Sequence, residues 1–455
     1  MSTKLTSEGL SDSPSFSARS LGAGRPEPPR TEPPRTEPPP GSTRRSLLAL
    51  LAAIALIVAL AVALNAGALL IVIVSLIIIV MVHELGHFAT AKWSHMRVTE
   101  YFVGFGPRLW SIRRGETEYG VKAIPAGGYV KIPGMTNLEE IDPQDEPRTY
   151  RRQPFRNRIL VASAGSIMHF VMAFLLAWAA LVFIGTPSAN GVVIESFTPF
   201  AGMALNPAQQ AGLRAGDEVL SVDGHAVHTV DGFSAVIKKA VGVPVHLVVE
   251  RGGRHVSLTV LPVNGHNVKS DGQRLSTKRE GYIGVFLSSP SVPENAFGAL
   301  GGAGKVVGQV TSASVTGLGH LFSPHGIVTY VSQVANPAVA AKDQRNGTSR
   351  PESIVGAGRI AVQAAHAGVL ELIEVLIALN IFIGLFNMLP ILPLDGGHVA
   401  IALYERVRTR RNRPFYQADA AKLLVVAYVF VFLLVLLVSS SVYLDITHPV
   451  ANPFG

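Results

Sequence analysis

Four long stretches of the sequence contain no charged residue, and they constrain the fold more than any other feature. They cover residues 46–82, 159–184, 375–394 and 423–444. A helix that crosses the hydrocarbon core of a membrane needs about 20 mainly apolar residues, and each stretch supplies them. Only 15% of all residues are charged, against about 25% in an ordinary soluble domain. The chain is therefore predicted to be a polytopic α-helical membrane protein.

The first stretch is too long for one span. At about 1.5 Å per residue, a helix over residues 46–82 would far exceed a hydrocarbon core of roughly 30 Å. The tripeptide Asn65-Ala66-Gly67 has the composition of a turn. We therefore expect an extra N-terminal span over 46–64 and a second span over 68–91, with one long tilted helix as the alternative. The other expected spans are 159–184, 371–394 and 423–444, so that there are about five in total.

Basic residues indicate how the chain is oriented. They precede the first span as Arg44 and Arg45, and they are frequent in the connecting segments 92–158 and 395–422. Short basic loops stay in the cytoplasm. This distribution predicts a multi-pass membrane protein with a cytoplasmic N-terminus. The insert over 185–370 and the tail over 445–455 would then lie outside.

Net charge and cysteine content exclude several classes of function. The net charge of +8 is explained by the basic membrane loops, so no nucleic-acid partner is expected. The chain has no cysteine, which excludes disulfides, thiolate catalysis and cysteine metal ligands. Residues 1–45 are rich in proline and contain RTEPP twice, which indicates a disordered cytoplasmic arm. A ligand for a proline-binding module is the alternative interpretation of this arm.

The insert begins with a β-rich region over residues 188–265. Short runs of valine, isoleucine and leucine alternate there with glycine and proline, as in small β domains. The segment AGLRAGDEVLSVDG at residues 211–224 resembles a PDZ domain. The resemblance implies binding of extended peptides, including free C-termini, by strand addition; a structural domain without a ligand is the alternative. Residues 266–370 are expected to form a linker and short amphipathic helices against the membrane or this domain.

The sequence HELGH ends the second predicted span. Its residues His83 and His87 are four positions apart, so both imidazoles lie on one helix face, with Glu84 beside them. Two neutral imidazoles are suitable zinc ligands, and a neighbouring carboxylate can take a proton from a zinc-bound water. A pair of histidines reaching the membrane interface is the alternative. Such groups are costly in a membrane unless they are paired or bind metal, which favours the zinc site.

A third ligand is expected because a catalytic zinc usually has three protein ligands and an open position. Asp395 occurs in the sequence NMLPILPLDGGH at the end of the fourth predicted span. By the predicted topology, this end lies on the same side of the membrane as HELGH. Prolines there interrupt the helix and glycines permit close backbone approach. A carboxylate that merely ends a helix is one alternative, and the other candidate ligands are Glu100, Glu116 and Glu118.

HELGH, the PDZ-like insert and NMLPILPLDGGH together resemble the site-2 protease family of intramembrane zinc proteases over roughly residues 68–444. The sequence YFVGFGP at residues 101–107 is similar to bacterial members, and the overall spacing is most similar to actinobacterial ones. Residues 118–131 resemble the family's membrane-reentrant β-hairpin, which we expect over residues 116–134. The resemblance implies a four-span protease core, to which the span over 46–64 is an addition.

The resemblance also implies residue roles. His83, His87 and Asp395 would bind one zinc ion, and Glu84 would be the general base. Asn387 would hold the unwound substrate, and the hairpin at Gly127, Gly128 and Tyr129 would pair with the substrate as an added strand. Substrates would be single-pass membrane proteins, for example an anti-sigma factor already trimmed outside, as in regulated intramembrane proteolysis. The PDZ-like insert would filter or recruit them, and the lipid bilayer surrounds the spans.

The third predicted span departs from the family. Members often carry a Gly-Pro pair and an asparagine where this chain has Ala164-Gly165-Ser166-Ile167-Met168-His169. His169 is expected to be a packing residue that faces the bundle, with a functional role as the alternative. A membrane scaffold with a vestigial metal site and a metal transporter are the rival functions. The intact pair of motifs argues against the scaffold, and no repeat among the spans supports the transporter.

Overall fold

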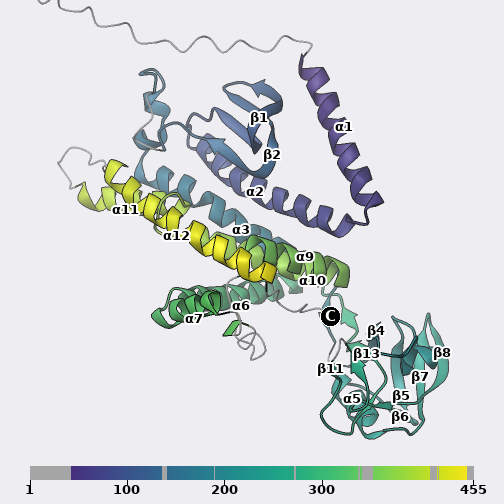
Figure 1. Cartoon of the computed structure of the whole chain (residues 1–455). Coiled ribbons are helices and arrows are strands. Elements are labelled where there is room, and N and C mark those ends of the chain that lie inside the picture. Colours follow the sequence, from purple (N-terminus) through teal and green to yellow (C-terminus); the bar gives the residue numbers. More distant parts are fainter. Residues whose placement is uncertain are drawn as a thin grey trace, which may run out of the picture.

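The structure is a computed structural model that describes residues 42–447 except for 136–140, 189, 271–272, 337–338, 341–351, 410–417 and 419. Most of the proline-rich arm expected over 1–45 and of the tail expected over 445–455 lies outside these residues. The described chain forms a helical bundle, a β-hairpin beside it and a separate β-rich domain (Figure 1).

Among the residues that the structure describes, five helices are long and apolar enough to cross a membrane, as expected for a polytopic membrane protein. These helices are α1 (Ser42–Ala63), α2 (Gly67–Trp93), α3 (Phe155–Phe183), α10 (Val369–Asn387) and α12 (Ala420–Thr447). Helices α1 and α2 are separated at Asn65, whose φ of 53° is in the left-handed region. Asparagine tolerates this conformation better than most residues do. The predicted division of the first apolar stretch into two helices is therefore confirmed.

Helix α3 is the centre of the bundle and packs against α2, α6, α10 and α11. Its alanines Ala173 and Ala177 are buried in a cluster with Ile377 and Ile381 of α10. Small side chains allow helices to approach closely, which is the usual way that membrane helices pack. The same cluster includes Ala299 and Ala303 of α6 (Gly298–Leu321).

The helices of the insert agree only in part with the short amphipathic helices expected over 266–370, because one of them is long. Helix α6 has 24 residues and packs against α3 and α10 of the bundle. Helix α7 (Pro324–Ala335) is tied to α12 because Tyr330 Oη forms hydrogen bonds with the hydroxyls of Ser440 and Ser441. Helix α9 (Ile354–Ala367) packs against α2, α10 and α12. The glycine- and alanine-rich composition of this region gives little indication of how long its helices are.

The β-hairpin lies beside α2 (Figure 1). Its antiparallel strands are β1 (Glu100–Arg114) and β2 (Thr117–Lys131), so the hairpin begins at Glu100 and the expected start at residue 116 is wrong. The pairing is irregular, and Gly104 and Gly106 adopt positive φ values of 83° and 82°. Tyr101 Oη donates a hydrogen bond to the Met81 carbonyl at 2.9 Å, which ties β1 to α2.

The β-rich domain contains a sheet with the strand order β13-β4-β5-β7-β8, and β6 pairs with β5. These strands are β13 (Val285–Ser288), β4 (Val193–Phe197), β5 (Glu218–Val222), β7 (Val245–Arg251), β8 (Arg254–Val260) and β6 (His225–Ala226). The domain therefore extends beyond residue 265, because β13 pairs with β4. Helix α5 (Val230–Lys239) contributes Phe233 and Ile237 to the domain's apolar core.

The segment after α10 is also different from the prediction. Residues 395–422 were expected to be a basic loop, but α11 (Asp395–Arg408) is a helix and Asp395 is its first residue. Pro390 and Pro393 lie in the turn that precedes the helix, and the helix itself contains no proline.

The remaining short elements are η1 (Glu146–Arg148), η2 (Tyr150–Arg152), β3 (Thr186–Pro187), α4 (Pro207–Gln210), β9 (Val263–Asn264), β10 (Lys269–Ser270), β11 (Gln273–Arg274), β12 (Gly281–Tyr282) and β14 (Ser291–Val292).

Candidate metal centre

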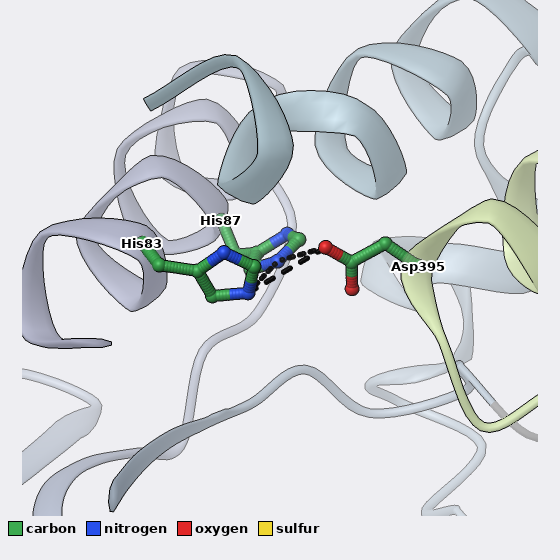
Figure 2. A group of neighbouring side chains, drawn as sticks. All are labelled: His83, His87 and Asp395. Carbon is green, nitrogen blue, oxygen red and sulfur yellow. Dashed lines mark hydrogen bonds and ion pairs between the residues drawn. The ribbon is translucent and has the colours of Figure 1, made fainter. Parts of the chain in front are cut away.

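Three side chains from two distant parts of the chain converge at one point (Figure 2). His83 and His87 extend from α2, and their Nε2 atoms are 3.3 Å apart. Oδ2 of Asp395 lies 3.5 Å from His83 Nε2 and 3.3 Å from His87 Nε2. The three ligand atoms all lie within 4.8 Å of one another. The structure thus brings together the two motifs that the sequence placed on one side of the membrane.

Asp395 reaches this point because α11 folds back onto the end of α10. The turn over residues 388–394 passes directly against the first residues of α11. A Cβ on Gly396 would lie 2.2 Å from the Met388 carbonyl oxygen, and one on Gly397 would lie 2.6 Å from the Leu392 nitrogen. Only glycine permits so close an approach of two backbone segments. The first turn of a helix also favours a carboxylate, because unpaired N–H groups give this end a positive potential.

Helix α3 covers the other side of the two histidines at Gly165. A Cβ at this position would lie 2.3 Å from His83 Cε1 and 2.4 Å from His87 Nε2. The glycine therefore makes room for both imidazoles. The Ala164-Gly165 pair was recognised in the sequence only as part of a departure from the family pattern. Its role depends on a helix crossing that the local sequence does not specify.

A hydrogen bond orients His87. Its Nδ1 lies 2.7 Å from the carbonyl oxygen of Val161 in α3, which accepts a hydrogen bond from the Nδ1–H group. This bond places the proton on Nδ1 and leaves the lone pair of Nε2 directed at Asp395. Metal-binding histidines usually have such a partner for the second nitrogen.

Glu84 lies beside the three side chains and is in contact with the hairpin. Its Oε2 accepts a hydrogen bond of 3.0 Å from the Val130 backbone N–H of β2. Gly128 is close by, because a Cβ there would lie 2.7 Å from Met81 Sδ and 3.6 Å from Glu84 Cγ. Strand β2 therefore passes directly over the first histidine turn of α2.

Other residues singled out in the sequence lie near the site without joining the cluster. Tyr129 points into the hairpin, where its hydroxyl donates to Glu100 and accepts from Lys122 Nζ at 2.6 Å. Burial is the main cause that raises the pKa of Tyr129 above its ordinary value, and the contact with Glu100 adds to it. Asn387 is the last residue of α10 and is half-buried.

Three glutamates were alternative ligands, and none of them approaches the histidines in the described part of the chain. Glu116 is bound by Lys92 and Arg148, and Glu118 is paired with Arg108. Glu100 accepts from the Tyr129 hydroxyl. These carboxylates belong to the hairpin and its base, and Asp395 is the carboxylate that the fold brings to HELGH.

His169 is packed against His83. Its ring centre is 4.9 Å from that of His83, and the residue is 1% exposed. Its Nδ1 forms a hydrogen bond of 3.1 Å with Oδ1 of Asn380, whose Nδ2 donates to the Leu376 carbonyl at 2.8 Å. Because Asn380 donates through Nδ2, its Oδ1 accepts a hydrogen bond from the Nδ1–H group of His169. His398 lies in α11 with its ring 6.3 Å from the ring of Tyr150.

The donor set fits zinc. Two imidazole nitrogens and one carboxylate oxygen are the usual protein ligands of a catalytic zinc, and they leave a fourth position for water or substrate. Glu84 is adjacent and is not one of the three. The cluster has the composition of a hydrolytic metal centre.

Comparisons with known proteins agree with this chemistry. Residues 71–437 match the family model described as Peptidase family M50. The zinc metalloprotease Rip1 of Mycobacterium tuberculosis is 32% identical over 399 residues, which cover 83% of this chain and 96% of that protein. Rip1 of Mycolicibacterium smegmatis is 31% identical over 84% of this chain and 96% of its own length.

A more distant relative agrees as well. A putative zinc metalloprotease of Clostridium perfringens is 30% identical over 72% of this chain and 85% of its own length. The family match and these relatives show that the chain is a multi-pass membrane protein with zinc metalloendopeptidase activity. The chain belongs to peptidase family M50, the site-2 protease family, and is an actinobacterial-like member of it.

Proposed function

We propose that this zinc protease hydrolyses peptide bonds within or near the transmembrane segment of single-pass membrane proteins. The observation that carries the proposal is the convergence of His83, His87 and Asp395 at a point where Glu84 and strand β2 also meet. An anti-sigma factor trimmed outside the membrane is the substrate that the family resemblance favours, and the reaction would be a step of regulated intramembrane proteolysis.

The proposed mechanism assigns one role to each residue. His83, His87 and Asp395 hold the zinc ion, which when bound lowers the pKa of a water and polarises the substrate carbonyl. Glu84 accepts a proton from the attacking water and returns it to the leaving amine. The hydrogen bond from Val130 N–H keeps the Glu84 carboxylate beside the reacting bond.

Strand β2 would position the substrate. A helical substrate keeps its carbonyl groups in internal hydrogen bonds, so it must unwind before it is cut. An unwound segment can pair with a strand edge through its backbone. Gly127, Gly128 and Tyr129 lie on the part of β2 that is nearest Glu84, which supports pairing there. Asn387 would hold the other side of the unwound segment.

The β-rich domain would act on the substrate before cleavage. It contains a cavity of about 790 Å³ lined by Phe233 and Lys238 of α5 and by residues 281–287. A cavity between a helix and a strand edge is the place where PDZ domains bind peptide C-termini. We assign the domain to this class, with new C-termini as ligands and a role as a filter or a dock for trimmed substrates.

The orientation follows from the basic loops and is part of the proposal. The N-terminus and the hairpin would face the cytoplasm of a bacterial cell, and the β-rich domain would lie outside its plasma membrane. The chain has no cysteine, so single cysteines can be introduced as probes. An impermeant maleimide should label K239C in intact cells and should label R113C only after lysis. The reverse pattern would overturn the orientation.

Replacing Glu84 tests the mechanism. Glu84→Gln should retain about one zinc ion per chain, because Glu84 is not a ligand. Cleavage of a reporter with a single transmembrane segment should fall by roughly 1,000-fold, because the proton acceptor is lost. Asp395→Ala should lower zinc binding and cleavage together. Undiminished cleavage by Glu84→Gln would reject the assigned base, and zinc binding indifferent to Asp395 would reject the ligand set.

A further inference from the structure

A buried ion pair joins α11 to α3 away from the metal ligands. Arg158 Nη1 in α3 lies 2.7 Å from Glu405 Oε2 in α11, and the two side chains are 7% and 3% exposed. Removing two charges from water is costly, and breaking such a pair leaves one buried charge without a partner. The other Glu405 oxygen accepts a hydrogen bond of 2.7 Å from the Ala418 N–H, just before α12. One carboxylate thus connects α11 to two other parts of the bundle.

The buried face of α11 carries few large side chains. Its buried residues are Gly396, Gly397, Ala402 and Glu405. The first three carry at most one methyl group each, so their burial removes little apolar area from water. The large side chains Leu403 and Val407 are 53% and 73% exposed. Val399 adds an apolar contact with the cluster that contains Tyr150 and Val161, and the Arg158–Glu405 contact is the buried ion pair of this helix.

Asp395 is the first residue of the same helix, ten positions before Glu405. A helix of that length is rigid and spans about 15 Å, or about 2.8 turns. Its beginning packs on the proline-containing turn at residues 388–394, and its later part is held by the ion pair. Any rotation or shift of α11 at Glu405 moves the carboxylate of Asp395 relative to the two histidines.

Tyr150 supports the ion pair from behind. It is 2% exposed, and its hydroxyl donates to the Arg158 carbonyl at 3.2 Å. Its ring centre lies 5.2 Å from the Arg158 guanidinium carbon, within the range of a cation–π contact. The same ring lies 6.3 Å from that of His398, which is on α11. Tyr150 therefore helps to fix the position of Arg158 independently of Glu405.

We propose that Arg158 and Glu405 are positioning residues of the metal centre. Their ion pair fixes α11 against α3 and so holds Asp395 within ligand distance of His83 and His87. This inference rests on the proposed role of Asp395 as a ligand. It assigns a function to two charges that lie outside both sequence motifs.

Zinc affinity of the full chain in detergent, measured by competition with a chelator, tests the inference without a substrate. Glu405→Gln should weaken zinc binding by about 10- to 100-fold, the usual effect of losing a contact that orients a ligand. Glu405→Asp keeps the charge and hence the fold, but its shorter side chain should still weaken binding by roughly 10-fold.

The matched control is the ion pair between Asp217 and Arg251 in the β-rich domain. Asp217 is also buried, and its two oxygens accept two hydrogen bonds of 2.7 Å from the Arg251 guanidinium. Asp217→Asn breaks a comparable pair that has no link to α11. Its zinc affinity should equal that of the wild type. An equal loss in this variant would show that any broken ion pair lowers affinity and would overturn the proposal.

The decisive comparison uses an Asp395→Ala background. If Glu405 acts through Asp395, adding Glu405→Asp to Asp395→Ala should cause no further loss of zinc affinity. A further loss as large as in the wild-type background would mean that Glu405 acts on the fold in general, and would overturn the positioning role. Wild-type affinity in both Glu405 variants would overturn it as well. In either case the effect of Asp395→Ala alone tests the ligand set separately.

Discussion

The β-rich domain and the helical region around the metal centre have different kinds of interior. Buried apolar residues form the main core of the β-rich domain, among them Leu247 and Val249 at 0% exposure. The region around the metal buries His83, His87 and the Arg158–Glu405 pair, and α3 approaches the histidines at a glycine. Apolar cores tolerate changes that keep total volume. A buried polar site depends on individual contacts, so single atoms should matter more there.

The largest effect is expected from the smallest change at the metal centre. Gly165→Ala adds one methyl group that would lie 2.3 Å from His83 Cε1 and 2.4 Å from His87 Nε2. The backbone of α3 and both imidazoles cannot all keep their positions. Zinc affinity should fall by more than about 100-fold, beyond the effect of losing one orienting contact, as measured by chelator competition.

Gly308→Ala is the matched control for this variant. Gly308 also lies within a helix, and a Cβ at this position would have no atom within 4 Å apart from the neighbouring backbone of its own helix. The change should leave zinc affinity unchanged and should stabilise α6 slightly, because alanine favours helices. Normal zinc binding by Gly165→Ala would show that the metal centre adjusts as easily as an apolar core, which would remove the proposed contrast between the two regions.

The second prediction concerns the interior of the β-rich domain. Leu247→Ala removes a side chain that is 0% exposed and should lower the domain's free energy of unfolding by about 2–5 kcal/mol. Zinc affinity should stay unchanged, because the domain contributes no residue to the metal cluster. Hydrogen exchange of the β5 and β7 amides measures the first effect and chelator competition the second.

Leu261→Ala is the control, because Leu261 is 52% exposed. Its effect on the free energy of unfolding should be within about 0.5 kcal/mol, as for most surface substitutions. A loss of zinc on Leu247→Ala would show that the two regions are coupled through the fold. The description of the molecule as two separately stabilised interiors would then be wrong.

The sequence predicted the features that depend on local pattern. The apolar stretches specified the spans, and HELGH and Asp395 specified residues that do converge. What it missed depends on contacts between distant residues. Strand β13 pairs with β4 across the whole β-rich domain, so its membership could not be inferred from residues 188–265 alone. Helix α11 follows a turn with two prolines and ends with Arg406 and Arg408, a composition that equally fits a loop.

The third prediction concerns Asn380, which holds His169 against His83. Asn380→Leu keeps a similar volume but removes the oxygen that accepts from His169 Nδ1 at 3.1 Å. The His169 ring should then lose its fixed position, and zinc affinity should fall by about 10-fold. Asn387→Leu on the same helix is the control and should bind zinc as the wild type does. Equal affinity in both variants would show that His169 only fills space, as a residue of an ordinary core would.

The smallest expected effect lies at the turn between β1 and β2, where the contacts are polar but partly open to solvent. Glu116 accepts hydrogen bonds from Arg148 at 2.7 and 2.9 Å and from Lys92 at 2.6 Å. The hydrogen bond from Arg148, followed by that from Lys92, lowers the pKa of Glu116 to about 2. These contacts connect the hairpin turn to the end of α2 and to η1.

A lowered pKa in the folded state means that the ionised carboxylate stabilises the fold. That contribution is complete above the ordinary pKa near 4.5 and is lost as the pH falls towards about 2. Glu116→Gln should lower the free energy of unfolding of the hairpin by about 1 kcal/mol or less at neutral pH, because the ion pairs of Glu116 are partly exposed. The difference from the wild type should be constant above about pH 5 and should narrow below it. If the stability difference between Glu116→Gln and the wild type persists undiminished at about pH 3, Glu116 contributes through packing rather than through its charge. The hairpin turn would then resemble the apolar core more than the metal centre.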